Sequence, residues 1–333
     1  MKILVTGATG FLGMALARRL KTRNDEVTVL GRNPVILSTL AQAGMRPIQA
    51  DLADTAAIHA ACQGQDLVFH SGALSSAWGP ARDFHLSNVI GTRNVIAGCE
   101  AGHVQRLVYV STPSIYFRFG SRLAVREDAE LPTQAANEYA RTKLLAEKEI
   151  DRAFAHGLPV ITIRPRAIFG EGDNAILPRL ISRLKSGRLR VIGDGQNITD
   201  LTYVENVVDA LLLCAEAPDT LLGRKYNITN AEPLPLWDLI KKVCQALGYE
   251  YPHSRIPYPA ALGLAATLEL ICHLLPGQPE PLLTRYMVGV LAKSTTLDIS
   301  AARHDLGYQP RISVNEGFER FVHWWQTKDT DKK

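Results

Sequence analysis

The sequence predicts an α/β protein built on a doubly wound parallel sheet, followed by a smaller and mostly helical C-terminal domain. Short apolar runs alternate with segments of helical apolar spacing up to about residue 165, a pattern typical of strand–helix–strand units. The runs are apolar at nearly every position, as expected for parallel strands covered on both faces. Beyond residue 231 the chain is mostly helical and dotted with proline, without a visible repeat.

Each strand of the first part is placed by its apolar run. The expected strands are KILVTG (2–7), EVTVLGR (26–32), RPIQADL (46–52), DLVFHSGA (66–73), RLVYVST (106–112) and PVITIRP (159–165). Apolar spacing predicts helices at 11–23, about 83–101 and about 137–156,. Later in the chain, TYVENVVDALLLCAE is expected to be a strand end followed by a helix, and GRKYNITN a short strand. Because crossovers between parallel strands are right-handed, this alternation places helices on both faces of one sheet.

Composition excludes several classes of function. Apolar residues make up 46% of the chain, charged residues 21%, and the net charge is +4, without the Lys and Arg stripe that nucleic acid binding demands,. The five cysteines form no CxxC pair and the histidines no HExxH motif, so we expect no metal and a reducing, cytoplasmic compartment,. The apolar run after Met1 reaches glycine too early for a signal peptide, so the folded domain is expected to begin there.

A glycine-rich loop follows the first strand directly. TGATGFLG (6–13) places Gly7, Gly10 and Gly13 in the spacing GxxGxxG, just before a helix. Gly7 allows a tight turn, Gly10 lets backbone amides approach a pyrophosphate, and Gly13 lets helix and strand pack closely. In this context the motif predicts a Rossmann-type dinucleotide-binding domain.

We therefore expect two domains and a tail. The dinucleotide-binding domain comprises residues 1–170 and about 200–230, and the substrate-binding domain about 171–199 and 231–326. Residues 327–333 are too polar to pack and are expected to form a flexible tail,.

The residues after the second strand predict which dinucleotide binds. Arg32 and Asn33 stand where an acidic residue would accept a hydrogen bond from the free 2′-hydroxyl of NAD,. A guanidinium suits a 2′-phosphate instead, and no carboxylate is expected beside it. NADP(H) is therefore the preferred cofactor, with NAD(H) as the alternative. Asp51, after the third strand, either accepts from the adenine amino group or caps the next helix.

Tyr139 and Lys143 form a candidate proton-transfer pair. They lie four residues apart in NEYARTK (137–143), on one face of a predicted helix,. A free tyrosine has a pKa of about 10, which a nearby cation would lower. Ser111 and Thr112 end the fifth strand at the ligand-binding edge of the sheet, where a hydroxyl can hydrogen-bond the developing oxyanion of a carbonyl. The alternative for these hydroxyls is capping of the strand end.

A series of motifs runs through nearly the whole chain: TGATGFLG, DLVFHSGA, NVIGTRNVIAGC, LVYVST, YARTK, IRPRAIFGEGDN, DLTYVENVVDA, YNITN and DISAARHDLGYQP. In this order they resemble the extended short-chain dehydrogenase/reductase family, and within it the 3β-hydroxysteroid dehydrogenase/isomerase-like branch and its bacterial relatives. The resemblance implies Tyr139 as the general acid. It implies that Lys143 lowers the pKa of Tyr139 and holds the nicotinamide ribose, and that Thr112 binds the substrate oxygen. A homodimer is also expected.

The cofactor site expected from the motifs and the resemblance comprises Gly7, Thr9, Gly10, Phe11, Leu12, Gly13, Arg32, Asn33, Asp51, Leu52, Ser71, Gly72, Ala73, Asn88, Ser111, Tyr139, Lys143, Pro165 and Ile168. Three residues depart from the family pattern. Gly72 stands where such proteins often have alanine. Phe117 stands where sugar-nucleotide relatives usually have glycine, and Arg166 where many relatives have a small residue. Arg166 would either hold an acidic group on the substrate or turn outward to a carboxylate.

The expected reaction is hydride transfer between nicotinamide C4 and a carbonyl carbon, with Tyr139 as the acid in reduction and the base in oxidation. Residues 258–277 and 285–291 are expected to roof the site with apolar side chains. This favours a ketone or alcohol with a hydrophobic body: a sterol, a long-chain β-keto acid or an aromatic ketone. The stretch 259–276 is too short and interrupted to span a bilayer, so peripheral membrane contact is the alternative to a buried or lid helix.

Two other functions stay open. A nucleotide-sugar epimerase or dehydratase needs basic side chains for a diphosphate, which Arg179, Arg183, Arg188 and Arg190 could supply. A non-catalytic dinucleotide-sensing protein would use the fold only to hold its ligand.

Overall fold

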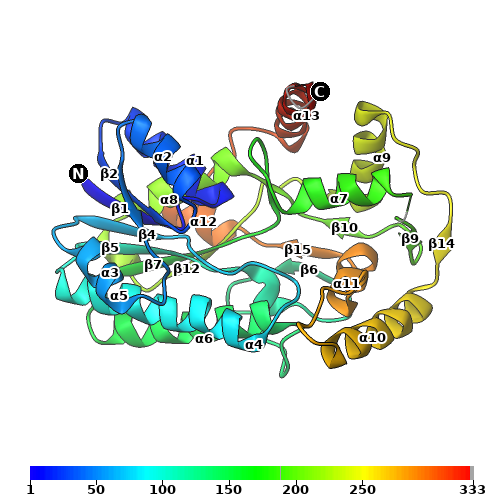
Figure 1. The fold of residues 1–333 in the computed structure, drawn as a ribbon, viewed down its shortest axis with the longest axis horizontal. Coiled ribbons are helices and arrows are strands. Elements are labelled where there is room, and N and C mark those ends of the chain that lie inside the picture. Colours follow the sequence, from blue (N-terminus) through cyan, green and yellow to red (C-terminus); the bar gives the residue numbers. More distant parts are fainter. Residues whose placement is uncertain (188, 331–333) are drawn as a thin grey trace.

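In the computed structural model, which describes residues 1–187 and 189–330, a parallel sheet dominates the N-terminal part (Figure 1). The sheet has seven strands in the order β12-β7-β5-β4-β1-β2-β3. The chain thus winds outward from β1 in both directions, which confirms the predicted doubly wound, Rossmann-type fold. The strands are β1 (Lys2–Thr6), β2 (Glu26–Gly31), β3 (Arg46–Gln49), β4 (Leu67–His70), β5 (Arg106–Val110), β7 (Val160–Pro165) and β12 (Lys225–Ile228).

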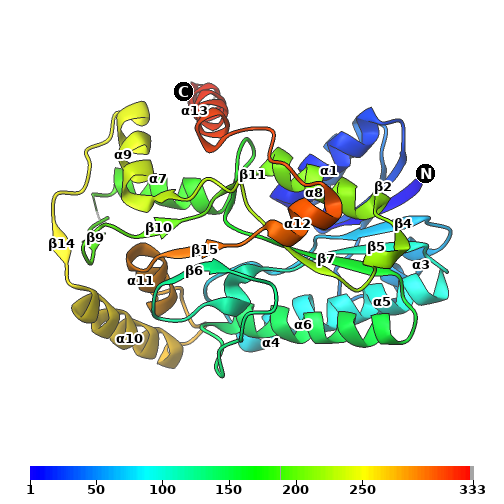
Figure 2. The same cartoon turned by 180° about the vertical axis from the view of Figure 1, so that it is seen from behind.

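Helices cover both faces of this sheet (Figures 1 and 2). One layer contains α1 (Phe11–Thr22), α2 (Pro34–Gln42) and α8 (Val204–Glu216), and the other α3 (Thr55–Cys62), α5 (Gly91–Ala101) and α6 (Glu138–Ala155). Side chains alternate along each strand. Val5 therefore packs into the core cluster of α1 and α8, while Leu4 packs into that of α5 and α6.

Capping residues explain two helices that apolar spacing alone did not predict. The Asn33 side chain accepts hydrogen bonds from the amides of Val35 and Ile36 at 3.0 and 3.2 Å, and α2 begins with Pro34. The Asp54 carboxylate accepts from the Ala57 amide at 3.1 Å and starts α3. Both are recognised N-terminal signals of helices. The helix expected at about 83–101 is a succession of α4 (Ala81–Phe84), the π-helical turn η1 (His85–Ile90) and α5.

The second part of the molecule lies beyond the carboxyl ends of the sheet strands. It contains a four-stranded sheet in the order β13-β10-β15-β6. These strands are β13 (Leu234–Pro235), β10 (Ile198–Thr199), β15 (Thr295–Leu297) and β6 (Arg122–Val125). The helices here are α7 (Ile176–Lys185), α9 (Leu236–Leu247), α10 (Tyr258–Leu274) and α11 (Arg285–Ala292). The remaining elements are β8 (Ile168–Phe169), β11 (Thr202–Tyr203), β9 (Val191–Ile192), β14 (Arg255–Ile256), the 3-10 turns η2 (Pro113–Tyr116) and η3 (Asp219–Leu221), α12 (Ser300–Leu306) and α13 (Val314–Thr330).

The domain limits expected from the sequence stay a prediction, and three segments depart from them. Strand β6 pairs with β15 in the second sheet, although residues 122–125 were assigned to the dinucleotide-binding domain. Helix α12 contacts β12 and α8 of the first part. Residues 327–330, which were expected to belong to the flexible tail, continue helix α13, which ends at Thr330. Residues 331–333 lie outside the described part.

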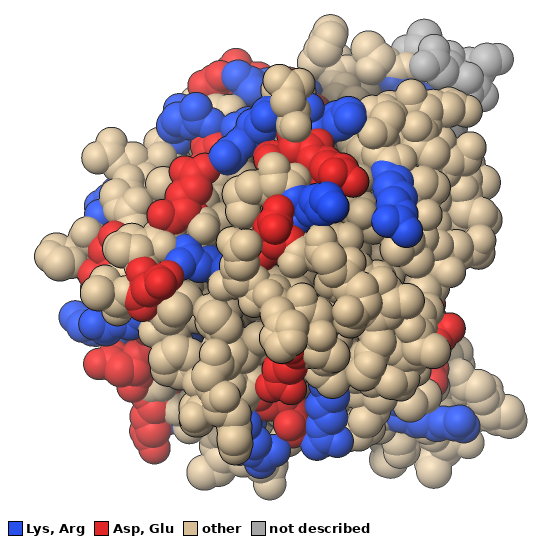
Figure 3. Space-filling view, turned by 90° about the vertical axis from the view of Figure 1, so that its left-hand side faces the viewer, with Lys and Arg blue, Asp and Glu red and all other residues tan. Residues whose placement is uncertain are grey.

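Helix α10 lies on the surface. Its Ala261 and Ala265 are buried against Val288 of α11, while Leu270 and Leu274 are 61% and 76% exposed. Among the described residues, no helix combines the length and the apolar character needed to cross a membrane. At the opposite end of the molecule, beyond α3 and β2, acidic and basic side chains are interspersed (Figure 3).

Candidate active site

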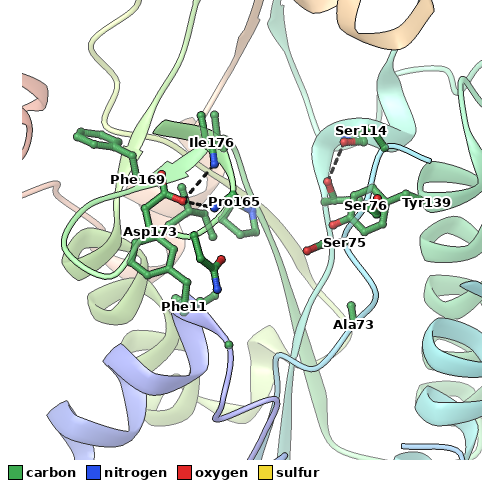
Figure 4. Close-up of a pocket in the computed structure, with 18 of the residues that line it drawn as sticks. Phe11, Ala73, Ser75, Ser76, Ser114, Tyr139, Pro165, Phe169, Asp173 and Ile176 are labelled. Atoms are coloured by element: carbon green, nitrogen blue, oxygen red, sulfur yellow. Dashed lines mark hydrogen bonds between the residues drawn. The ribbon is translucent and has the colours of Figure 1, made fainter. Parts of the chain in front are cut away.

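A cavity of about 750 Å³ runs from the glycine loop, past the carboxyl ends of the sheet strands, to the helices of the second part. Figure 4 shows two facing walls, with Tyr139 and Ser114 on one and Pro165 and Asp173 on the other. The predicted site residues that line the cavity are Gly7, Thr9, Gly10, Phe11, Leu12, Gly13, Arg32, Asp51, Leu52, Ser71, Gly72, Ala73, Ser111, Thr112, Tyr139, Lys143, Pro165 and Ile168. Asn33 and Asn88 do not line it.

The glycine loop leaves room for a phosphate group at the start of α1. A Cβ on Gly10 would meet only the Gly7 carbonyl oxygen, at 3.2 Å, whereas one on Gly7 would lie 2.5 Å from the Gly72 Cα. No side chain caps α1, and its first turn contains no acidic residue. The free amides and positive dipole end of this helix therefore fit the pyrophosphate of a dinucleotide.

The two asparagines excluded from the cavity serve the fold instead. The side-chain oxygen of Asn33 caps the N-terminus of α2. Asn88, buried in η1, accepts from the Leu74 amide at 2.7 Å and donates to the Thr142 hydroxyl at 3.0 Å. Asn88 thus ties the loop after β4 to α6, the helix that carries Tyr139.

A carboxylate does stand beside Arg32, contrary to the expectation. Because β2 and β3 are neighbours, the residues that follow them meet, and Arg32 Nη1 lies 3.4 Å from Asp51 Oδ2. Both side chains are well exposed, at 67% and 47%, so the pair is weakly held,. Asp51 accepts from the Ala53 amide at 2.9 Å, and the predicted capping of α3 is performed by Asp54 instead.

Hydroxyl groups form a chain beside Tyr139. Thr112 Oγ1 donates to Ser114 Oγ at 3.1 Å, and Ser114 Oγ lies 3.0 Å from the Tyr286 hydroxyl. Thr112 also accepts from the Ser114 amide at 3.2 Å, so it caps η2 as well as facing the cavity. Ser114 and Tyr286 were not predicted. Tyr286 lies 172 residues from Ser114 in α11, and no local pattern marks it.

Burial shifts the pKa values of both Tyr139 and Lys143 in the direction that favours the neutral side chain. Burial raises the pKa of Tyr139 to about 12, with hydrogen bonding by Thr112 opposing the shift and Tyr286 adding to it. Burial lowers the pKa of Lys143 to about 7, and Glu147 opposes that shift. The predicted lowering of the tyrosine pKa by Lys143 is not found. The lysine Nζ donates to the Val110 carbonyl at 2.7 Å and lies 4.3 Å from the centre of the Tyr109 ring.

Ser111 faces a buried ion pair. Its hydroxyl donates to Glu147, whose carboxylate also forms an ion pair with Arg164 at 2.6 Å. Glu147 and Arg164 are only 2% and 4% exposed. The Ser111 hydroxyl is thus engaged on the protein side, whereas that of Thr112 lies next to the phenol.

Asp173 was also missed, although it lines the cavity. Its carboxylate accepts from the amides of Ala175, Ile176 and Leu177 at 2.7 to 3.1 Å, and Figure 4 shows it at the base of α7. The sequence signal was available, since an aspartate before a helix is a common cap.

The expected apolar roof is partly wrong. Residues of α11 do line the cavity, together with residues of α7 and α9, but none of α10 does. The α10 segment looked like core because it is apolar nearly all round, and such a helix offers no stripe that identifies its buried face. The apolar residues at this end are Ile176, Leu177, Leu180, Leu189, Leu236, Leu239, Ile240, Met287, Val290 and Leu291.

Two of the four arginines considered for a diphosphate lie in the cavity. Arg179 is 3.5 Å from Glu280, and Arg183 donates to the Leu282 carbonyl at 2.9 Å. Arg190 does not line the cavity and donates to Ser254, while Arg188 lies outside the described residues. Across the described residues, no group of three or more His, Cys, Asp or Glu could hold a metal ion.

Comparison with known proteins agrees with this geometry. The model of the 3-beta hydroxysteroid dehydrogenase/isomerase family matches residues 4–259. A 2-alkyl-3-oxoalkanoate reductase of Stenotrophomonas maltophilia (strain K279a) is 39% identical over 331 residues, covering 96% of this chain and 98% of that protein. The decarboxylating sterol-4-alpha-carboxylate 3-dehydrogenase of Homo sapiens is 32% identical over 326 residues, covering 96% and 86%.

A solved structure shares the architecture. MoeE5 in complex with UDP-glucose and NAD superposes with a TM-score of 0.78 and 25% sequence identity, over 98% of this chain and 99% of that one. The glycine loop, the dinucleotide-sized cavity and the match over most of the chain agree with one another. The chain belongs to the 3-beta hydroxysteroid dehydrogenase/isomerase family and is an NAD(P)-dependent dehydrogenase/reductase.

Proposed function

We propose that the protein interconverts a ketone and a secondary alcohol on a largely apolar substrate, with NADP(H) as the preferred cofactor. The observation that carries the proposal is the position of Tyr139 and Thr112 on the wall of a cavity that joins the glycine loop to an apolar chamber. A phenol and a hydroxyl at this place suit proton transfer to, and stabilisation of, an oxygen that gains charge.

When bound, the nicotinamide supplies or accepts the hydride. Tyr139 gives its proton to the substrate oxygen during reduction and takes it back during oxidation. In the free protein the pKa of about 12 keeps Tyr139 protonated, which is the form needed for reduction. Thr112 would turn its single hydroxyl hydrogen from Ser114 to the same oxygen when the substrate binds, and Lys143 would hold the nicotinamide ribose.

The remaining expected cofactor contacts follow the cavity wall. The amides that follow Gly10 would hold the pyrophosphate. Leu52, Gly72 and Ala73 would lie along the adenosine, and Pro165 with Ile168 would back the nicotinamide ring. Ser111 and Asn88 would act through the fold, since their side chains are bonded within the protein.

The names of the two relatives support a narrower class of substrate for this protein. One describes a 3-oxo acid that is alkylated at C2, and the other a sterol that reacts at C3 and bears a carboxylate at C4. In both, the carboxylate is attached to the carbon next to the reacting one. Among the three predicted substrate types, we therefore favour a long-chain β-keto acid and its β-hydroxy counterpart. The apolar chamber between α7, α9 and α11 suits the chain.

The cofactor preference rests on Arg32. Its guanidinium suits a 2′-phosphate, and the exposed ion pair with Asp51 is weak enough to exchange partners,. NAD(H) remains the alternative, because the Asp51 carboxylate beside Arg32 would repel a 2′-phosphate.

A nucleotide-sugar epimerase or dehydratase is the second candidate. Arg179 and Arg183 line the cavity, and MoeE5 was solved with UDP-glucose. The apolar residues around these arginines favour a hydrocarbon body over a diphosphate. A non-catalytic dinucleotide-sensing protein is set aside because the family consists of oxidoreductases. The homodimer, the peripheral membrane contact and the cytoplasmic location stay predictions.

The proposal is tested by following the hydride. Net transfer of deuterium from C4-labelled NADPH to the carbonyl carbon of a ketone supports it. Epimerisation or dehydration of a sugar nucleotide without net consumption of added cofactor would support the second candidate.

A further inference from the structure

Arg166 is a partly buried cation on the cavity wall that forms no close ion pair with any described residue, and its Nε has no hydrogen-bond partner. We propose that its guanidinium binds a carboxylate attached to the carbon next to the reacting one, and so selects β-oxo and β-hydroxy acids over neutral ketones and alcohols. The inference rests on the proposed function and assigns a residue to the recognition of the acid group.

The main chain fixes where this side chain starts. The Arg166 amide donates to the Ile228 carbonyl at 3.0 Å, and its own carbonyl accepts from the Thr202 hydroxyl. Arg166 directly follows Pro165, the last residue of β7, which Figure 4 shows on the wall opposite Tyr139. Its side chain lines the cavity, so the expected alternative of a turn outward to a surface carboxylate is not found.

The guanidinium has unused donors. Its Nη2 donates to the Thr199 hydroxyl at 3.3 Å, while its Nε is buried and has no hydrogen-bond partner. None of the ion pairs found among the described residues includes Arg166. The acid that interacts with it electrostatically is Asp200, but the Asp200 Oδ2 accepts from the Leu297 amide at 2.7 Å.

Such an arrangement is costly unless a ligand completes it. Burial lowers the pKa of Arg166, which means that the surroundings disfavour the charged form that an arginine nevertheless keeps,. A buried charge normally has a counter-charge and filled hydrogen bonds. The planar fork of a guanidinium matches a carboxylate in both charge and geometry.

Arg166 also lies close to the reacting groups. The Tyr286 hydroxyl is bonded to Ser114, and Tyr286 interacts electrostatically with both Tyr139 and Arg166. The acid that would protonate the substrate oxygen and the cation that would hold the carboxylate therefore flank one tyrosine. This suits a substrate whose oxygen and carboxylate are borne by adjacent carbons.

The other arginines of the cavity differ from Arg166. Arg32 and Arg179 are paired with Asp51 and Glu280 at 3.4 and 3.5 Å. Arg183 donates to the Leu282 carbonyl. It shares the cavity and the charge with Arg166 but has no buried nitrogen without a hydrogen-bond partner among those found, which makes it the matched control.

The test compares a 2-alkyl-3-hydroxyalkanoate with its methyl ester, each oxidised with NADP⁺. Because a hydrogen-bonded charge contributes about 1.5–3 kcal/mol, Arg166→Gln should lower kcat/KM for the acid by about 10- to 100-fold, mainly through KM. Activity with the ester, which lacks the charge, should change by less than about 3-fold. Arg166→Lys should retain part of the preference for the acid, and Arg183→Gln all of it.

Equal losses for acid and ester in Arg166→Gln, or no loss for either, would overturn the proposal. So would a loss of acid preference in Arg183→Gln. If the wild-type protein oxidises neither compound, the proposed function fails, but equilibrium binding of the acid and the ester to the wild type and to Arg166→Gln still decides the role of Arg166. Unchanged melting and NADP⁺ binding of the variant exclude a folding defect.

Discussion

At the scale of single residues, Arg32 and Asp51 stand side by side on the cavity wall with opposite charges. The cation suits a 2′-phosphate, which the acid would repel. Their contact at 3.4 Å joins residues that follow adjacent strands.

Exchanging these two side chains for neutral ones should separate the cofactors. Arg32→Ala removes charge-assisted hydrogen bonds to the 2′-phosphate and should weaken NADP(H) binding by about 10-fold or more, with a much smaller effect on NAD(H). Asp51→Asn, the control, removes a repulsive charge and should leave NADP(H) binding equal or tighter. Titration of each variant with all four cofactor forms measures this. Equal weakening of NADPH and NADH by Arg32→Ala contradicts the 2′-phosphate assignment.

Lys143 connects protonation to stability. It is 2% exposed, and burial lowers its pKa from 10.5 to about 7. Between these two values the unfolded chain keeps a proton that the folded protein has released. Stability therefore rises with pH in this window, by at most about 1.4 kcal/mol per pH unit.

Lys143→Met should remove this dependence. Between pH 7.5 and pH 9.5, the free energy of unfolding of the wild type should gain on the order of 2 kcal/mol relative to the variant. Urea denaturation at several pH values provides the measurement. The lost bond to Val110 adds an offset that does not vary with pH, so only the slopes are compared. Parallel curves would mean that Lys143 stays charged in the folded protein.

At the scale of elements, helices α10 and α11 differ in their relation to the apolar chamber, because α11 lines it and α10 does not. Helix α11 contributes Met287, Val290 and Leu291 to the cavity. Its Gly289 packs so closely on Phe117 that a Cβ there would lie 2.4 Å from the Phe117 Cζ. Phe117, noted as a departure from the family pattern, thus fixes the position of α11. Helix α10 packs behind α11 and away from the cavity.

Matched polar substitutions should distinguish the two helices. Val290→Asn places an amide in the apolar wall and should lower kcat/KM for long-chain substrates by about 10-fold or more, with less effect on short water-soluble ketones. Leu270→Asn on the exposed face of α10 should change neither. The measurement is kcat/KM over a series of chain lengths. A selective loss of long-chain activity in Leu270→Asn would return α10 to the substrate site.

The sequence predicted those elements whose signals are local. The strands were predicted because each is an apolar run of a few residues. The glycine loop was predicted because it is a short motif whose turn needs glycine at position 7, where φ is +71°,. Contacts between residues that are far apart in the sequence could not be predicted in this way. Tyr286 beside Ser114, and Asp51 beside Arg32, depend on tertiary structure. The position of α10 over the cavity was predicted wrongly, because uniform apolarity does not distinguish a buried helix from one at the surface.

At the scale of the whole molecule, one cavity joins the expected cofactor site to the expected substrate site, and the two sites are formed by different parts of the chain. The carboxyl edge of the sheet provides the cofactor side, as is general for open α/β sheets. The helices of the second part, far along the chain, lie beyond that edge (Figure 1). Their side chains line the apolar chamber. Tyr139 stands where the two meet, so the account depends on its action as the acid of a net reduction.

The most direct test is a turnover experiment with NADPH that carries deuterium at both C4 positions and a long-chain β-keto acid or ketone. If Tyr139 is the acid of a hydride transfer, the product should carry one deuterium at its carbinol carbon for each NADPH oxidised, and Tyr139→Phe should lower the rate by about 10²- to 10⁴-fold without loss of cofactor binding. A product without deuterium, or an undiminished rate in Tyr139→Phe, would contradict this mechanism.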